Sequence, residues 1–105
     1  MFARSVTMRL KPNSVAEFNR TFEKEILPLL QKQKGFQDAI SLMASNGSKV
    51  VGISLWDQKE DAEAYNLTTY TEVQKILSRG IEGTPQVQTY EVSMSTIHKT
   101  ASQHA

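Results

Sequence analysis

The first stretch of the chain alternates between apolar and polar residues. Between residues 2 and 10 the odd positions are small or polar, and most even positions are apolar: Phe2, Val6, Met8 and Leu10. A period of two places these apolar side chains on one side of an extended strand. The pattern therefore predicts a strand over residues 2–10 with one apolar face, on which Arg4 is the exception.

The period then lengthens to three and four residues, which predicts a helix over residues 14–34. Ser14 and Glu17 have the spacing of a capping box, in which each side chain accepts a hydrogen bond from a free backbone N–H of the first turn. Gly35 is a typical helix stop. Pro28 predicts a kink, because it removes one backbone donor inside the helix. The apolar positions of this segment are Val15, Phe18, Phe22, Ile26, Leu29 and Leu30.

Two further strands are predicted over residues 36–44 and 49–56. Asn46 and Gly47 between them are the strongest short signal for a hairpin turn. With these two residues at the turn, Ile40 lies opposite Ile53 and Leu42 lies opposite Val51 on one side of the hairpin. The other side is mostly small or polar, and this register puts Ser41, Ser54 and Trp56 on it.

The second half of the chain predicts a broken helix and a last strand. Capping patterns begin at Asp57 and at Thr69, so the helix has two parts. Gly80, Gly83 and Pro85 end this region, and alternation returns over residues 86–97 as a strand of about twelve residues, longer than usual. Residues 98–105 have no periodicity and are expected to form a loose tail.

The predicted order is βαββαβ, which is typical of a ferredoxin-like α+β domain over residues 1–97. Two right-handed crossovers place four strands in one antiparallel sheet with both helices on the same face. The other face is then bare, and we expect it to pack against a second copy in a homodimer through Trp56, Ser41 and Ser54. The alternative is a monomer whose sheet faces water.

Composition narrows the class of protein. A chain of 105 residues with 39% apolar and 22% charged residues fits one folded domain. It has no cysteine, which excludes disulfides and thiolate metal sites. The net charge of +1, without a block of like charge, argues against nucleic-acid binding. The first residues resemble neither a signal peptide nor a membrane span, so we expect no membrane association and a cytoplasmic location.

Several short motifs resemble those of the antibiotic biosynthesis monooxygenase family. They are Lys34-Gly35-Phe36 after the first helix, Ile53-Ser54-Leu55-Trp56 before an acidic helix, and Ala62-Glu63-Ala64-Tyr65 within it. The resemblance covers about residues 2–97 and implies a dimeric α+β barrel. It also implies oxygenation of an aromatic polyketide or quinol without a metal or flavin, so no cofactor is expected, because the substrate itself reduces oxygen.

A haem-degrading branch has a similar layout, but its iron-binding pattern does not fit this sequence. The places where that branch has an Asn, a Trp and a His fall at or near Ser5, Tyr65 and Lys75. The only histidines, His98 and His104, lie in or beside the tail, where exposure is the simpler interpretation. We therefore expect neither haem nor another metal.

A ligand pocket in this fold would lie between the apolar face of the sheet and the helices. The residues that the sequence places there are Val6, Met8, Phe18, Phe22, Ile40, Leu42, Tyr65 and Tyr70. The two tyrosines are weak catalytic candidates, because their hydroxyls can hydrogen-bond a substrate carbonyl or phenol in an apolar cleft. The alternative is that both lie at the surface with their hydroxyls in water.

Charged residues on the same predicted face supply two more candidates. Arg4 is a weak catalytic candidate that would hold an anionic or phenolate substrate, since a buried charge is costly unless it is paired. Alternatively it extends its guanidinium into water from the strand end. Asp38 is its predicted salt-bridge partner or, in a second interpretation, a general base.

Two functions fit these features, and the sequence leaves open whether the protein is an enzyme. The first is a cofactor-independent monooxygenase that oxidises a small aromatic or quinol-like substrate. The second is a noncatalytic dimer of the same fold that binds a small ligand or has a stress-related role. Hydrolase, metalloenzyme and nucleotide-binding functions lack their motifs.

Overall fold

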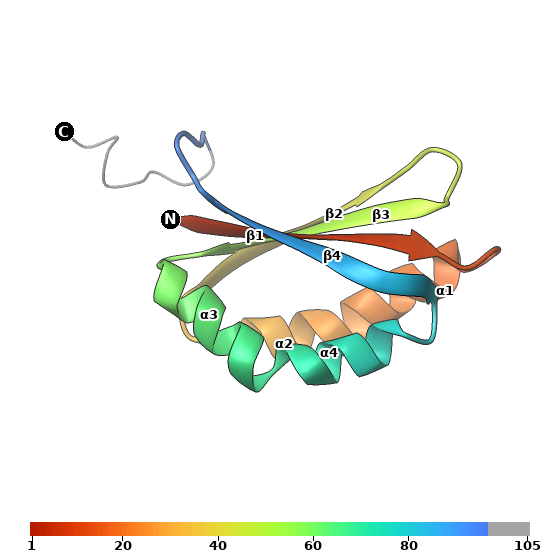
Figure 1. Ribbon diagram of the computed structural model, residues 1–105, viewed down its shortest axis with the longest axis horizontal. Helices are drawn as coiled ribbons and strands as arrows, with labels where there is room; N and C mark the ends of the chain where they lie inside the picture. The colour runs from red at the N-terminus through yellow and green to blue at the C-terminus, as the bar shows by residue number, and fades with distance from the viewer. Residues whose placement is uncertain (97–105) are drawn as a thin grey trace.

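The computed structural model describes residues 1–96 and contains one four-stranded antiparallel sheet with helices on one face (Figure 1). The strands are β1 (Phe2–Leu10), β2 (Phe36–Met43), β3 (Lys49–Trp56) and β4 (Ile81–Glu91). They lie in the order β2-β3-β1-β4, which is the ferredoxin-like α+β arrangement that the sequence predicted. The predicted tail, 98–105, with both histidines, lies outside the described residues.

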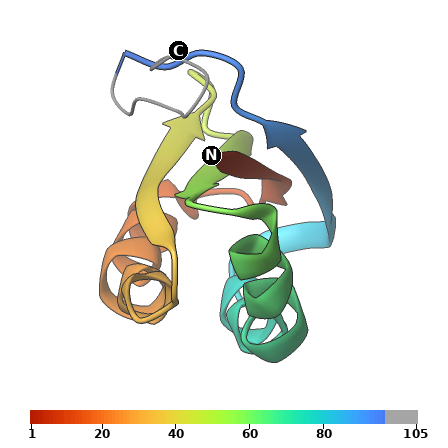
Figure 2. The ribbon, with the colours of Figure 1, turned by 90° about the vertical axis from the view of Figure 1, so that its left-hand side faces the viewer.

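The helices form two arms beneath the sheet. The first arm runs without interruption through α1 (Val15–Thr21), a π-helical turn η1 (Phe22–Ile26) and α2 (Leu27–Gln31). The second arm consists of α3 (Lys59–Thr68) and α4 (Tyr70–Leu77), which meet at Thr69. Figure 2 shows the arms side by side under one face of the sheet, and no helix formed by residues 1–96 covers the other face. The predicted broken helix is confirmed.

The predicted helix starts are confirmed within a residue or two, but not the side-chain caps. Ser14 precedes α1, yet its hydroxyl is hydrogen-bonded to the carbonyl of Pro12 and caps nothing. Gln58, not Asp57, precedes α3, and Thr69 precedes α4, again without a capping hydrogen bond. The spacing of the apolar side chains and their burial therefore determine where these helices form, and the expected capping hydrogen bonds are not made.

The last strand differs from its prediction at both ends. It begins at Ile81, inside the segment expected to be a turn, and ends at Glu91. Its pairing with β1 shifts between Thr7 and Arg9, where Gly83 adopts a positive φ of 71°. Gly83 and Pro85 therefore belong to a bulge in an edge strand, a place in a ladder that tolerates both residues.

The hairpin register is confirmed, but the side of the hairpin that meets the helices was predicted wrongly. Ile40 lies opposite Ile53 and Leu42 opposite Val51, as expected. Pairing with β1, however, puts Trp56 beside Phe2 and Ser54 beside Arg4, on the helix-covered face. Trp56 is completely buried against Phe36 and Tyr65.

Three predicted dimer contacts and two predicted pocket residues therefore lie on the face of the sheet opposite to the one that was predicted for them. Ser41, Ser54 and Trp56 share the helix-covered side of the hairpin, which removes them from the proposed contact surface. Ile40 and Leu42 lie on the helix-free face and are exposed. The reason is that the helices bring large aromatic side chains to the sheet, so the small residues of the hairpin fit beneath them.

Candidate functional site

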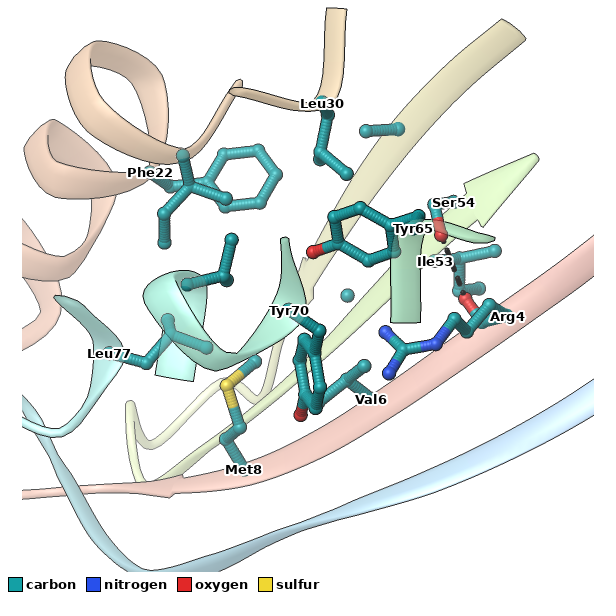
Figure 3. A pocket seen from close by; sticks show the side chains of 14 residues that line it. Arg4, Val6, Met8, Phe22, Leu30, Ile53, Ser54, Tyr65, Tyr70 and Leu77 are labelled. Atoms are coloured by element: carbon teal, nitrogen blue, oxygen red, sulfur yellow. Dashed lines mark hydrogen bonds between the residues drawn. The ribbon is translucent and has the colours of Figure 1, made fainter. Parts of the chain in front are cut away.

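A small cavity lies between the middle of the sheet and the two helical arms (Figure 3). Its volume is about 50 Å³. Apolar side chains line most of it: Val6, Met8, Phe22, Ile26, Leu30, Ala39, Ile53, Val73 and Leu77. Gly52 and Ser54 leave room on the β3 side, and Arg4, Tyr65 and Tyr70 supply the polar groups.

The first arm keeps one row of side chains aligned along this cavity. Phe22, Ile26 and Leu30 follow one another at intervals of four residues. In an α-helix four residues exceed one turn of about 3.6, so such a row drifts around the axis. The π turn is wider, with the N–H of Leu27 bonded to the carbonyl of Phe22 five residues back, and it counters the drift. Pro28, at which a kink was predicted, lies in α2 directly after this π turn, and the π turn shapes the cavity wall.

Arg4 brings a permanent positive charge into this apolar setting. Its residue is only 3% exposed, because β1 lies inside the sheet and Arg4 points to the helix-covered face. One guanidinium nitrogen donates a hydrogen bond of 2.8 Å to Oδ1 of Asn66 on α3. Within residues 1–96 no carboxylate lies within 4.0 Å of the guanidinium. A buried charge with so few partners favours an incoming anion.

Two tyrosine rings hold the guanidinium from the helix side. Its central carbon lies 4.0 Å from the ring centre of Tyr70 and 5.3 Å from that of Tyr65. Both distances are within the range of cation–π attraction. Figure 3 shows the guanidinium beside the two rings and the Tyr65 hydroxyl pointing into the cavity. The helix break at Thr69 places the last turn of α3 and the first turn of α4 around the same charge.

The hydroxyls of these tyrosines are buried and stay protonated. Burial raises the pKa of Tyr65 to about 12, although the charge of Arg4 acts in the opposite direction. Burial also raises the pKa of Tyr70, again opposed by Arg4. The Tyr70 hydroxyl has no hydrogen-bond partner within the described part of the chain. Each hydroxyl is therefore a neutral donor, and that of Tyr70 is available to a ligand.

Ser54 and Trp56 support the site from β3. The indole N–H of Trp56 donates a hydrogen bond of 2.9 Å to the Ser54 hydroxyl, which lies at 3.5 Å from the backbone carbonyl of Arg4. The Trp56 ring also packs on Tyr65, with ring centres 5.2 Å apart. Trp56 thus fixes the position of a site residue and does not itself line the cavity.

The structure brings together most of the residues that the sequence placed in the pocket. Arg4, Val6, Met8, Phe22, Tyr65 and Tyr70 all line the cavity. The alternatives in which Arg4 or the tyrosines lie in water are wrong, since all three are buried. Phe18 is buried in the core but does not line the cavity, and Ile40 and Leu42 lie on the other face.

Asp38 and Asn66 differ most from expectation. Asp38 is paired with Leu55 on the helix-free face, so it is not the salt-bridge partner of Arg4 that was predicted. The partner is Asn66, which no sequence pattern indicated, because it follows Tyr65 on an exposed turn of α3. The bulge at Gln37 in β2 leaves Asp38 opposite Leu55.

Two absences apply to the described chain. Residues 1–96 contain no group of three or more His, Asp and Glu side chains placed to hold a metal ion. In the same part of the chain, no helix has the length and apolar character needed to cross a membrane.

Comparison with known proteins finds similarity in structure. No family model matches the sequence, and no curated protein matches it either. A monooxygenase from Streptomyces coelicolor, ActVA-Orf6, solved in complex with nanaomycin D, superposes with a TM-score of 0.77 and 16% identity, over 93% of this chain and 92% of that one. SnoaB from Streptomyces nogalater, a cofactor-independent oxygenase, gives a TM-score of 0.75 and 13% identity over 92% and 97% of the two chains.

A third similar structure is a protein of unknown function from Nitrosomonas europaea, with a TM-score of 0.75, 15% identity, and coverage of 93% and 94%. At such identities the similarity concerns the fold. These superpositions show that the four-stranded sheet and its helices have the fold of the antibiotic biosynthesis monooxygenases.

Proposed function

We propose that the protein is a cofactor-independent monooxygenase that oxidises a small aromatic or quinol-like substrate in the cavity beside Arg4. The observation that carries the proposal is the buried guanidinium, which has no carboxylate partner in residues 1–96 and packs against two tyrosine rings. The fold shared with known oxygenases supports it.

Arg4 would act by selecting and stabilising the ionised form of the substrate. The described residues that line the cavity include no carboxylate and no imidazole, and the raised pKa of Tyr65 makes it a poor base. The substrate therefore binds as its phenolate or enolate, whose oxygen faces the guanidinium. The Tyr70 hydroxyl, which lacks a partner, donates a hydrogen bond to the same oxygen.

The bound anion is electron-rich enough to reduce oxygen directly. For an anthrone, the ring methylene becomes a carbonyl: one O₂ is consumed, one oxygen atom enters the product, and the other leaves as water with the two methylene hydrogens. The protein contributes by binding the anion beside a fixed positive charge and by excluding water from it. The cavity of about 50 Å³ has to open to admit a ring, since even benzene occupies an engineered cavity of about 150 Å³ in another protein.

Oxygen uptake with a panel of anthrones and quinols tests the proposal. Arg4→Met keeps the length and packing of the side chain and removes the charge, so we expect uptake above the buffer rate to fall about 100-fold. Arg9→Met, on the exposed side of the same strand, should leave it unchanged. If the wild type consumes no oxygen above buffer with any member, the noncatalytic ligand-binding function takes the place of this proposal. If Arg4→Met retains full activity, the oxidation does not depend on Arg4 and its proposed role is wrong.

We also propose that the protein is a homodimer built on the helix-free face. This face carries the aliphatic side chains of the hairpin, including Ile40 and Leu42, and the ring of Tyr90, which is 52% exposed. Side chains of this kind on a bare sheet favour contact with a second copy. The surface differs from the one that Trp56 was expected to form.

A further inference from the structure

The cavity has to gain room before a ring can enter it, and Met8 is the part of its wall best suited to move. Among the described residues that line the cavity, Met8 alone has a long unbranched apolar side chain, with three rotatable bonds. The other large side chains of the wall are branched or aromatic, apart from Arg4. Two of the rings are held by neighbouring rings. Phe22 stacks on Phe18 at 6.2 Å between ring centres, and Tyr65 packs on Trp56 at 5.2 Å.

The end of the Met8 side chain lies over Gly52 of the neighbouring strand. A Cβ placed on Gly52 would lie 3.9 Å from Cε of Met8 and 4.0 Å from the backbone carbonyl oxygen of Val6. Beyond the adjoining residues of β3, no other atom of residues 1–96 would lie within 4 Å of it. Figure 3 shows the Met8 side chain pointing from β1 toward the helices. Its terminal methyl therefore occupies space that Gly52, having no side chain, leaves free.

The bulge of β4 leaves the other side of Met8 without a fixed neighbour. β1 pairs with β4 at Thr7 and again at Arg9, but the register shift between them gives Met8 no partner in β4. A Cβ placed on Gly83, within the bulge, would have no atom of the described chain within 4 Å. The interrupted ladder thus gives the Met8 side chain room to rotate toward β4.

We propose that Met8 and Gly52 determine which rings the cavity accepts: Met8 rotates away from Gly52, and a ring of a flat aromatic ligand takes the place of its methyl group against β3. Gly52 lies two residues along β3 from Ser54, the cross-strand neighbour of Arg4, a distance of about 7 Å. A ligand with two fused rings covers this span more fully than a single ring does. The inference rests on the proposed function, because it assumes that the ligand oxygen faces Arg4.

Gly52→Ala tests the place of the ring. The added methyl fits the ligand-free protein, and Gly52 does not have a positive φ, so thermal stability should not fall. The methyl remains where the ring has to lie. In calorimetry under argon, in mildly alkaline buffer that ionises the ligands, we expect the affinity for 6-cyano-2-naphthol to fall at least about tenfold. The loss for 4-cyanophenol, which lacks the second ring, should be less than about threefold.

Gly80→Ala is the matched control for this substitution. A Cβ at Gly80 would meet no atom of the described chain within 4 Å, and Gly80 does not line the cavity. Its affinity for both ligands should equal that of the wild type. Wild-type affinity for 6-cyano-2-naphthol in Gly52→Ala would overturn the inference.

Met8→Ala should change the affinity in the opposite direction. It opens the space over Gly52 before the ligand arrives, so we expect 6-cyano-2-naphthol to bind at least about tenfold more tightly than to the wild type. The lost packing lowers thermal stability, but a structural defect alone would weaken binding and not strengthen it. Met94→Ala, at an 80% exposed position, is the control. A folded Met8→Ala variant without a gain in affinity would show that the wall opens elsewhere and would contradict the role of Met8.

The failure of this inference and that of the proposed function are distinguishable. Naphthol binding that responds to both substitutions, without oxygen uptake on any anthrone or quinol, supports the role of Met8 and Gly52 and contradicts the monooxygenase. Oxygen uptake that depends on Arg4, with wild-type naphthol binding in Gly52→Ala and Met8→Ala, supports the monooxygenase and contradicts the inference.

Discussion

The two faces of the sheet carry different kinds of side chain, which suit the two different purposes that we propose for them. The helix-covered face places a buried charge, Arg4, among aromatic rings and small residues such as Gly52 and Ser54. The helix-free face carries aliphatic residues, Ile40 and Leu42 among them, on strands that no helix covers. An internal ligand site needs polar groups and empty space, whereas an association surface needs flat apolar area.

Truncating an aromatic residue on each face should give the largest difference in the free energy of unfolding. Trp56→Ala removes a completely buried ring that packs on Phe36 and Tyr65, so we expect the free energy of unfolding to fall by about 3–5 kcal/mol. Tyr90→Ala, on the helix-free face, should cost the monomer less than about 1 kcal/mol. Urea unfolding at a concentration where the chain is monomeric measures both. Similar losses of unfolding free energy in the two variants would contradict the difference in burial between the two faces.

Charges placed on the helix-free face should separate the two copies without unfolding them. The double variant Ile40→Asp and Leu42→Asp puts two carboxylates on the proposed contact surface, and we expect association to weaken about 100-fold, or about 2.7 kcal/mol. Sedimentation should then give a species of 11.8 kDa where the wild type gives twice that mass. Leu67→Asp, at an 82% exposed position of α3 away from this face, is the control. A wild-type chain that is already monomeric at micromolar concentration would contradict the dimer.

The smallest expected effect concerns the hydroxyl of Tyr70. It is buried without a partner in the described chain, so Tyr70→Phe should raise the free energy of unfolding by about 1 kcal/mol. The same change should weaken binding of the ligand anion, since the proposed donor is lost. Tyr90→Phe, whose exposed hydroxyl is hydrogen-bonded to Gln88, should change neither quantity. A stability loss in Tyr70→Phe would indicate that this hydroxyl has a stabilising role in the ligand-free protein.

Local patterns were enough to predict the elements, since each depends on neighbours along the chain. Alternation predicted β1, the Asn46-Gly47 turn predicted the hairpin register, and the third capping pattern, at Thr69, marked the break between α3 and α4. The bulge around Gly83 was missed, because a glycine next to a proline also predicts a turn. Strand limits depend on pairing partners that the local pattern does not contain.

Only part of the site could be predicted, because local patterns do not show which residues meet in the folded chain. Arg4 was identified because a charge interrupts an apolar row, and Tyr65 and Tyr70 because their hydroxyls can hydrogen-bond a substrate in an apolar cleft. Asn66 and the small residues that make room for the rings carry no such signal, since each is ordinary in its own segment. Their role in the site comes from their neighbours in the fold: Asn66 contacts Arg4, and the small residues face the rings across the cavity.

The sequence by itself determined that β2 and β3 each have two distinct sides, and which residues share a side. Only the tertiary structure decided which side meets the helices. Alternation is symmetric with respect to the two faces of a sheet, whereas the choice between them depends on volume: the rings of Tyr65, Tyr70 and Trp56 require small neighbours. That choice buried Trp56, left Ile40 and Leu42 exposed, and placed Arg4 at the cavity.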